Sequence, residues 1–152
     1  MRTLLLATGG FLLAVLWMDL MFDVQIARIV GAAEEREATI ASIARYYRRV
    51  TTDAFPMNRL IGMVMLVQLW GILEQVLLRR TVTGWCALLV SAFGVAPIAL
   101  AGAHIVPAAV RLGARADALP VQIALARDVY RGHVLCFAAI AAFLVLQLRA
   151  GA

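Results

Sequence analysis

The chain contains no lysine, only two cysteines and only four prolines among its 152 residues, and charged residues make up just 15% of it. Soluble domains average about 25% charged and about 45–50% apolar residues, whereas 64% of this chain is hydrophobic. The scarcity of charge excludes a soluble globular enzyme, a disordered tail and a coiled coil. A multi-span membrane protein remains.

The absence of lysine makes arginine the source of every positive side chain. We interpret this usage as the codon bias of a GC-rich genome. Separately, we expect a multi-pass protein of the cell membrane, in particular the bacterial inner membrane. The net charge of +5 does not indicate nucleic-acid binding, because the arginines lie at the edges of apolar runs, where they anchor helices and meet anionic lipid. The sequence therefore predicts the lipid bilayer as the partner.

The two cysteines, Cys86 and Cys136, follow the starts of the third and fourth apolar runs. Antiparallel neighbours place those starts at opposite membrane faces, which is too far for a disulfide, since the bond needs Cα atoms within about 7 Å. We expect both to be small apolar packing residues.

Four apolar runs approach or exceed the length of about 20 residues that a bilayer requires. They cover residues 3–22, 56–78, 84–106 and 132–148. The first is expected to be an uncleaved span, because Trp17, Met18 and Asp19 stand where a signal peptide has small cleavage-site residues. The predicted fold is an all-α integral membrane protein, a single domain over 1–152 with four transmembrane helices in two helical hairpins.

The third run is longer than one span needs. No charged residue occurs between Arg80 and Arg111, so we expect the third helix to break near Pro97 or Pro107. After a short polar loop over 111–118, a helix opening at Pro120 is predicted to continue into the fourth span.

An amphipathic helix is predicted over residues 33–52, after the first span. Ile40, Ile43, Tyr47 and Val50 recur at helical spacing and form one apolar stripe. Such a helix lies at the membrane surface or caps the bundle. Its polar side, with Tyr46, Tyr47, Arg48 and Arg49, could hold an anionic headgroup or form an aromatic and basic interfacial belt.

The arginines are divided unequally between the two membrane faces. The two long connections hold Arg28, Arg36, Arg45, Arg48, Arg49, Arg59, Arg111, Arg115, Arg127 and Arg131, and the other side holds Arg2, Arg79, Arg80 and Arg149. Because positive charge favours the cytoplasm, we predict that the long connections are cytoplasmic, although the Arg79-Arg80 pair in the shortest loop opposes this.

One predicted membrane face carries nearly all of the unusual polar residues. Four antiparallel spans bring together the end of the first, the start of the second, the end of the third and the start of the fourth. Located there are Asp19, Asp23, Asn58, Arg59, His104, Asp128, Arg131 and His133. The opposite face offers only Glu74, Gln75, Arg79 and Arg80.

The two aspartates of the first span are spaced i, i+4 and therefore share a helix face. Intramembrane carboxylates are costly and turn toward the bundle interior with a partner. Asp19 and Asp23 accordingly predict a proton-transfer or cation-binding site. The alternative is a structural ion pair with Arg48, Arg59 or Arg131.

The only histidines are His104 and His133. With Asp19 they could form a two-His, one-carboxylate metal site, and alone they could ligate haem between helices. The third alternative is a pair of hydrogen-bonded interfacial histidines. The catalytic candidates are therefore Asp19, His104 and His133, and the ligand-binding candidates are Asp23, Arg48, Asn58, Arg59, Asp128 and Arg131.

Three classes of function fit this pattern. The first is a protein that handles a small apolar or amphipathic molecule or a lipid in a polar pocket at one membrane face. The second is a structural or partner-binding subunit of a membrane complex, or a homo-oligomer, whose polar residues fix helix register. The third is a metal- or haem-bearing oxidoreductase. The sequence does not name a substrate or show that the protein is an enzyme.

Overall fold

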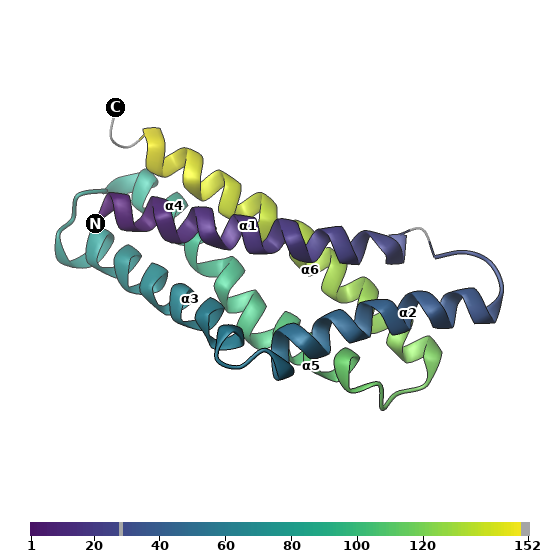
Figure 1. Ribbon diagram of the computed structural model, residues 1–152. Helices are drawn as coiled ribbons and strands as arrows, with labels where there is room; N and C mark the ends of the chain where they lie inside the picture. The colour runs from purple at the N-terminus through teal and green to yellow at the C-terminus, as the bar shows by residue number, and fades with distance from the viewer. Residues whose placement is uncertain (28, 150–152) are drawn as a thin grey trace.

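The computed structural model of the protein describes residues 1–27 and 29–149 and is almost entirely helical, with no strand in those residues (Figure 1). The helices are α1 (Arg2–Ala27), α2 (Ala33–Arg48), α3 (Met57–Leu73), α4 (Gly84–Leu100), α5 (Val106–Ala114) and α6 (Leu119–Arg149). Wider π-helical segments follow α2 (Arg49–Asp53), extend α3 (Glu74–Leu78) and join α4 to α5 (Ala101–Ile105). Arg28, one of the arginines counted for orientation, lies outside the described residues.

Four helical stretches are long and apolar enough to cross a membrane, as the sequence predicts. They are Arg2–Ala27, Asn58–Leu78, Gly84–Ala114 and Leu119–Arg149. The predicted tight connection between the second and third is also confirmed, since one helix ends at Leu78 and the next begins at Gly84. The all-α class and the number of candidate spans are therefore correct.

The helices form an elongated bundle in which α1 and α6 lie side by side (Figure 1). At the end that holds the N-terminus, α3 and α4 pack against this pair, and at the other end α2 and α5 do so. The 31 residues of α6 extend about 46 Å at 1.5 Å per residue. That length exceeds the roughly 30 Å of a hydrocarbon core.

The predicted break in the third helix is wrong. The chain stays helical from Gly84 to Ala114, with Pro97 buried inside α4 and Pro107 in the first turn of α5. Between the prolines the helix widens, and the backbone N–H of Val106 donates to the carbonyl of Ala101. Such a wide turn accommodates the missing proline N–H and the bulk of the ring without ending the helix.

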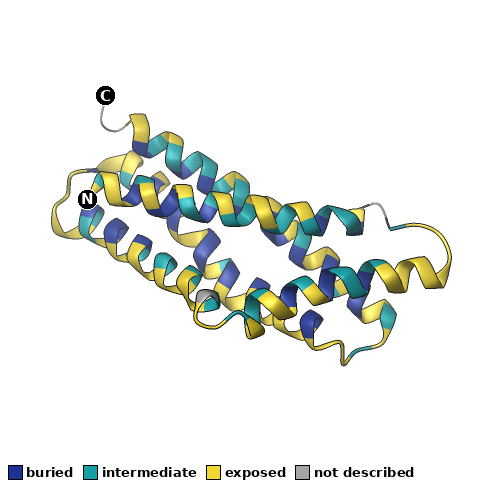
Figure 2. Ribbon diagram, in the orientation of Figure 1, coloured by how far each residue is buried: buried dark blue, intermediate teal, exposed yellow. Residues whose placement is uncertain are grey.

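The amphipathic prediction for the segment after α1 is confirmed for α2. Its buried residues are Ile40, Ile43, Ala44 and Tyr47, whereas Arg45 and Arg48 are exposed (Figure 2). The helix covers one side of the bundle, where it contacts α1, α5 and α6. The apolar stripe therefore fixes which side chains of α2 enter the interior.

Buried side chains form two separate core clusters. One, around Ile43, Leu112 and Val129, joins α2, α5 and α6 with the end of α1. The other, around Leu5, Val90 and Phe143, lies near the opposite end of the bundle. Several residues of the first cluster, among them Tyr47, Ile105 and Cys136, also line a cavity inside the bundle.

The contact between α2 and α5 depends on a glycine. A Cβ atom added to Gly113 would lie 2.8 Å from the backbone nitrogen of Arg48 and 3.0 Å from its Cα. Those atoms belong to the backbone of another helix and cannot rotate away. Glycine therefore allows α2 to approach α5 closely.

We predict that Gly113→Ala separates these helices and destabilises the protein by about 1–3 kcal/mol, the usual cost of overpacking. The matched control is Gly10→Ala, since a Cβ there meets no atom within 4 Å and alanine favours the helix by about 0.5–1 kcal/mol. Reversible unfolding in detergent, followed by circular dichroism, measures both changes. Equal stability of the two variants would contradict the close approach.

Candidate functional site

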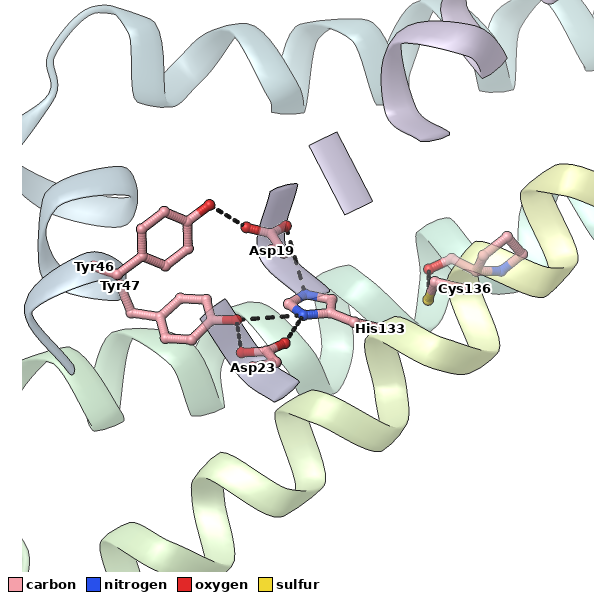
Figure 3. Close-up of polar contacts among 7 residues, drawn as sticks. Asp19, Asp23, Tyr46, Tyr47, His133 and Cys136 are labelled. Atoms are coloured by element: carbon pink, nitrogen blue, oxygen red, sulfur yellow. Dashed lines mark hydrogen bonds and ion pairs between the residues drawn. The ribbon is translucent and has the colours of Figure 1, made fainter. Parts of the chain in front are cut away.

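Five side chains from three helices converge near the middle of the bundle (Figure 3). Asp19 and Asp23 lie one turn apart on α1, Tyr46 and Tyr47 are adjacent near the end of α2, and His133 comes from α6. The i, i+4 spacing places both carboxylates on one face of α1. Neighbouring positions on a helix are about 100° apart, which lets each tyrosine reach a different aspartate.

Among the described residues, Asp23 is the most deeply buried aspartate, glutamate or arginine, with 1% of its surface exposed. One carboxylate oxygen lies 2.7 Å from Nδ1 of His133, and the other accepts a hydrogen bond of 2.5 Å from the Tyr47 hydroxyl. The Tyr47 oxygen also lies 3.3 Å from the same His133 nitrogen. Since a carboxylate only accepts, this geometry assigns the proton on Nδ1 to the bond with Asp23.

Asp19 lies on the other side of the imidazole. Its Oδ1 accepts a hydrogen bond of 2.7 Å from the Tyr46 hydroxyl, and its Oδ2 lies 3.9 Å from Nε2 of His133. The Tyr46 ring stacks on Phe22 at a centroid distance of 4.0 Å, which fixes its position. His133 is therefore held between two carboxylates but is hydrogen-bonded to only one.

Both tyrosines serve as neutral donors. Burial raises the pKa of Tyr47 far above its ordinary value, and the charges of Asp23 and Asp19 raise it further. Burial also raises the pKa of Tyr46, and Asp19 adds to the effect. Each phenol therefore keeps its proton and donates a hydrogen bond to a carboxylate.

A cavity of about 260 Å³ adjoins the cluster. Its polar lining residues, within the part of the chain that is described, are Asp19, Tyr47, Thr51, Asn58, His133 and Cys136. The other walls are apolar side chains from α1, α3, α4, α5 and α6, such as Leu12, Met65 and Ile140. The cavity thus has one polar end and a long apolar surface.

The cavity opens between α3 and α5. Gly62, Val106 and Val110 line it and are also exposed, the two valines to 46% and 45%. The helix α3 packs against α1 and α4 but hardly against α5. The opening is therefore bordered by apolar residues and lies to the side of the bundle.

The structure brings only part of the predicted polar face together. Asp19, Asp23 and His133 form the cluster, and Asn58 lines the cavity. Four other predicted ligand-binding residues are exposed and do not line the cavity: Arg48, Arg59, Asp128 and Arg131. Arg48 instead approaches Asp53 at 3.6 Å, and Arg59 lies over the ring of Phe55.

The expected arginine partners of the aspartates are wrong. Among the described ion pairs, none joins Asp19 or Asp23 to an arginine, and both interact with His133. A flexible guanidinium can reach water from the bundle surface, and these arginines remain exposed. The imidazole and two phenols take over the role that sequence reasoning assigned to arginine.

The predicted metal site is also not formed. His104 is exposed and does not line the cavity of His133 and Asp19. Over the described ranges, no three His, Cys, Asp or Glu side chains are grouped so that they could hold a metal ion. The face of the third helix that carries His104 points outward. The sequence indicates the position of His104 along the span, but not the direction in which its side chain points.

Sequence reasoning assigned the tyrosines to a membrane belt or an anionic headgroup and missed their role as donors to the aspartates. A signal was present, because Tyr47 lies on the apolar stripe of α2 and a buried tyrosine hydroxyl needs a partner. Thr51 was also missed as a lining residue.

Far from the cavity, the buried Gln75 and Gln147 exchange two amide hydrogen bonds of 3.2 Å and 2.8 Å, which sequence reasoning did not anticipate.

We predict that Tyr47→Phe destabilises the protein by about 1–3 kcal/mol, because Asp23 loses a donor while it stays buried. Tyr130→Phe is the matched control, since the Tyr130 hydroxyl makes no hydrogen bond with any described residue. We expect that control to change stability by less than about 0.5 kcal/mol. Unfolding midpoints in the same detergent compare the two, and a Tyr47→Phe variant as stable as the control would count against the hydrogen bond to Asp23.

Comparisons with known proteins do not bear on the function of this site, so the site is interpreted from its geometry. No family model, no curated protein and no solved structure matches the chain. The site is therefore characterised by what its residues form: a buried histidine oriented by one aspartate, facing a second aspartate and an apolar cavity.

Proposed function

We propose that the protein is a bacterial inner-membrane protein that binds a membrane-dissolved small molecule in the central cavity and exchanges a proton with it. The observation that carries this proposal is the cavity of about 260 Å³ whose polar end contains Asp19 and His133. This hypothesis combines membrane insertion, a small-molecule ligand and proton exchange.

Membrane insertion is supported by the exposed surface of the bundle. Exposed side chains on α3 and α4 include Met63, Leu66, Trp70, Trp85 and Leu88. A soluble monomer rarely exposes so continuous an apolar surface. The Asn58–Leu78 helix, with 21 residues, spans about 32 Å, close to a hydrocarbon core of about 30 Å.

This placement puts the polar cluster near one membrane boundary. Asn58 stands at the start of the α3 span and lines the same cavity as Asp19 and His133. The exposed charged residues of α2 and of the first part of α6, including Arg45, Arg127 and Arg131, then lie beyond the hydrocarbon. We propose that this side is cytoplasmic, because the long connections carry most of the arginines.

The ligand would enter from the lipid. The opening lies between α3 and α5 and is bordered by Gly62, Val106 and Val110. An apolar molecule dissolved in the bilayer could pass there without crossing charged groups. Its polar end would then reach Asp19 and His133 while its apolar part stayed against the cavity wall.

The histidine is arranged for proton exchange. Asp23 holds the Nδ1 side of the ring at 2.7 Å, which leaves Nε2 directed to Asp19 and the cavity. An aspartate that orients a histidine in this way fixes its tautomer and stabilises the imidazolium formed when Nε2 accepts a proton. The proton would pass from a polar atom of the bound molecule to Nε2, and return by the same path.

The geometry favours this function over that of a structural subunit. Gln75 and Gln147, which lie outside the cavity lining, satisfy one another through two hydrogen bonds. The cluster of Asp19 and His133 instead borders an open cavity. A role confined to register would not require that space.

The test uses the protein in phosphatidylcholine nanodiscs with ¹³C-labelled histidine. The chain has two histidines, and His104→Gln assigns their NMR signals. Three ten-carbon probes are added in turn: decylamine, decanol and decanoate. We expect at least one of them to shift the His133 signal with saturation and to leave His104, which is exposed and outside the cavity, without a saturable shift.

We further predict that Gly62→Phe blocks the opening and weakens the binding of that probe by at least about tenfold, the equivalent of about 1.4 kcal/mol. Gly10→Phe is the control, because neither glycine has an atom within 4 Å of an added Cβ and Gly10 does not line the cavity. If no probe shifts His133, or if both variants behave alike, the cavity is not a ligand site entered between α3 and α5.

A further inference from the structure

The polar side chains that line the cavity and can donate each make at least one hydrogen bond to another part of the protein. The Tyr47 hydroxyl donates to Asp23, the Thr51 hydroxyl to the carbonyl of Tyr47 at 2.7 Å, and the Cys136 thiol to the carbonyl of Pro97 at 3.5 Å. The Asn58 amide nitrogen donates to the carbonyl of Thr51 at 3.1 Å, and Nδ1 of His133 faces Asp23. Each polar lining residue that can donate therefore has a protein partner.

The open atoms at this end are acceptors. Asp19 Oδ2 and His133 Nε2 are 3.9 Å apart, which is too long for a hydrogen bond between them. The side chain of His133 is only 8% exposed, and its Nε2 makes no hydrogen bond with another described residue. Asn58 Oδ1 also lacks a partner among the described residues, but it is fully buried and is therefore not open to the cavity.

The charge of the cluster also indicates that a ligand should bring hydrogen-bond donors and a positive charge. With Asp19 and Asp23 ionised, the cluster is net negative whether His133 is neutral or protonated. The side chains that face it from the packed elements are Tyr46 and Tyr47 of α2, which donate hydrogen bonds but carry no positive charge. The apolar walls of the cavity offer no screening, so a bound cation would be strongly attracted.

We infer that the cavity binds a primary amine carried on an apolar chain, with its ammonium group between Asp19 and His133. This inference rests on the proposed ligand-binding function. An ammonium group has more than one N–H donor, so it can serve both open acceptors at once, and it supplies the missing positive charge. An alcohol brings a single donor and no charge, and a carboxylate brings acceptors and a negative charge.

The ammonium group also suits the proton exchange. A proton can move from the ammonium nitrogen to Nε2 of His133, which leaves a neutral amine and an imidazolium held by Asp23. The reverse transfer restores the ammonium group. No oxidant, reductant or other reactant is needed for either direction.

The three probes of the preceding experiment test the inference in the unaltered chain. Decylamine should shift the His133 signal at a concentration about ten to a hundred times lower than decanol, as expected for charge-assisted hydrogen bonds. Decanoate should not shift it. Decyltrimethylammonium, a cation without N–H donors, should bind more weakly than decylamine, because it cannot donate to the open acceptors.

The Asp19→Asn substitution removes the negative charge of Asp19 and keeps a side chain of nearly the same size. It should reduce the preference for decylamine over decanol to less than about threefold, since the charge-assisted bond is removed. Asp128→Asn, which removes an exposed aspartate outside the cavity, should keep the full preference. Circular dichroism shows whether each variant is folded, and the comparison of probes in the unaltered chain does not depend on either variant.

The outcomes separate this inference from the proposed function. Saturable binding of decanol or decanoate with equal or greater affinity would keep the ligand site and overturn the choice of an amine. Equal binding of decyltrimethylammonium would overturn the role of the N–H donors. If none of these probes shifts His133, both the ligand site and the amine are rejected.

Discussion

The constraint on which this structure depends is the cost of placing Asp23 inside an apolar bundle. An isolated buried carboxylate is so unfavourable that it must be paired and hydrogen-bonded. The partners come from elsewhere in the chain, with Tyr47 from α2 and His133 from α6. Three helices are thereby tied at one point. The apolar stripe of α2 and the glycine contact at Gly113 bring the tyrosines to the depth of the aspartates.

The same packing that gives both carboxylate oxygens of Asp23 a hydrogen-bond partner leaves one oxygen of Asp19 without one. Tyr46 donates to one oxygen of Asp19, but His133 remains 3.9 Å from the other. The cavity lies beside this open oxygen and is lined in part by residues of the first core cluster, such as Ile105 and Cys136. A buried histidine with one side fixed and the other side open is suited to proton exchange. The function proposed for the protein follows from that asymmetry.

Other buried polar side chains of the bundle differ in how far their hydrogen bonds are satisfied. Gln75 and Gln147 satisfy one another through two hydrogen bonds at the far end. Arg2 at that end donates to the carbonyls of Gln147 and Leu148. Gln68 and Gln122, by contrast, are buried, lie outside the cavity lining and make no side-chain hydrogen bond with a described residue. The open acceptors near Asp19 coincide with the cavity, which is why we assign them to a ligand.

The sequence by itself determined the helical class, the four apolar runs, the amphipathic α2 and the shared face of Asp19 and Asp23. Each follows from local periodicity, because residues i and i+4 of one helix are neighbours in any tertiary arrangement. The rotation of each helix about its own axis was decided only by packing between helices. That rotation turned His133 inward and His104 outward, and it replaced the expected arginines with Tyr46 and Tyr47. Likewise, Pro97 and Pro107 allow a break in isolation, but the widened turn between them keeps the helix continuous against its neighbours. Depth along a span can be read from the sequence, whereas direction around it depends on contacts between residues far apart in the chain.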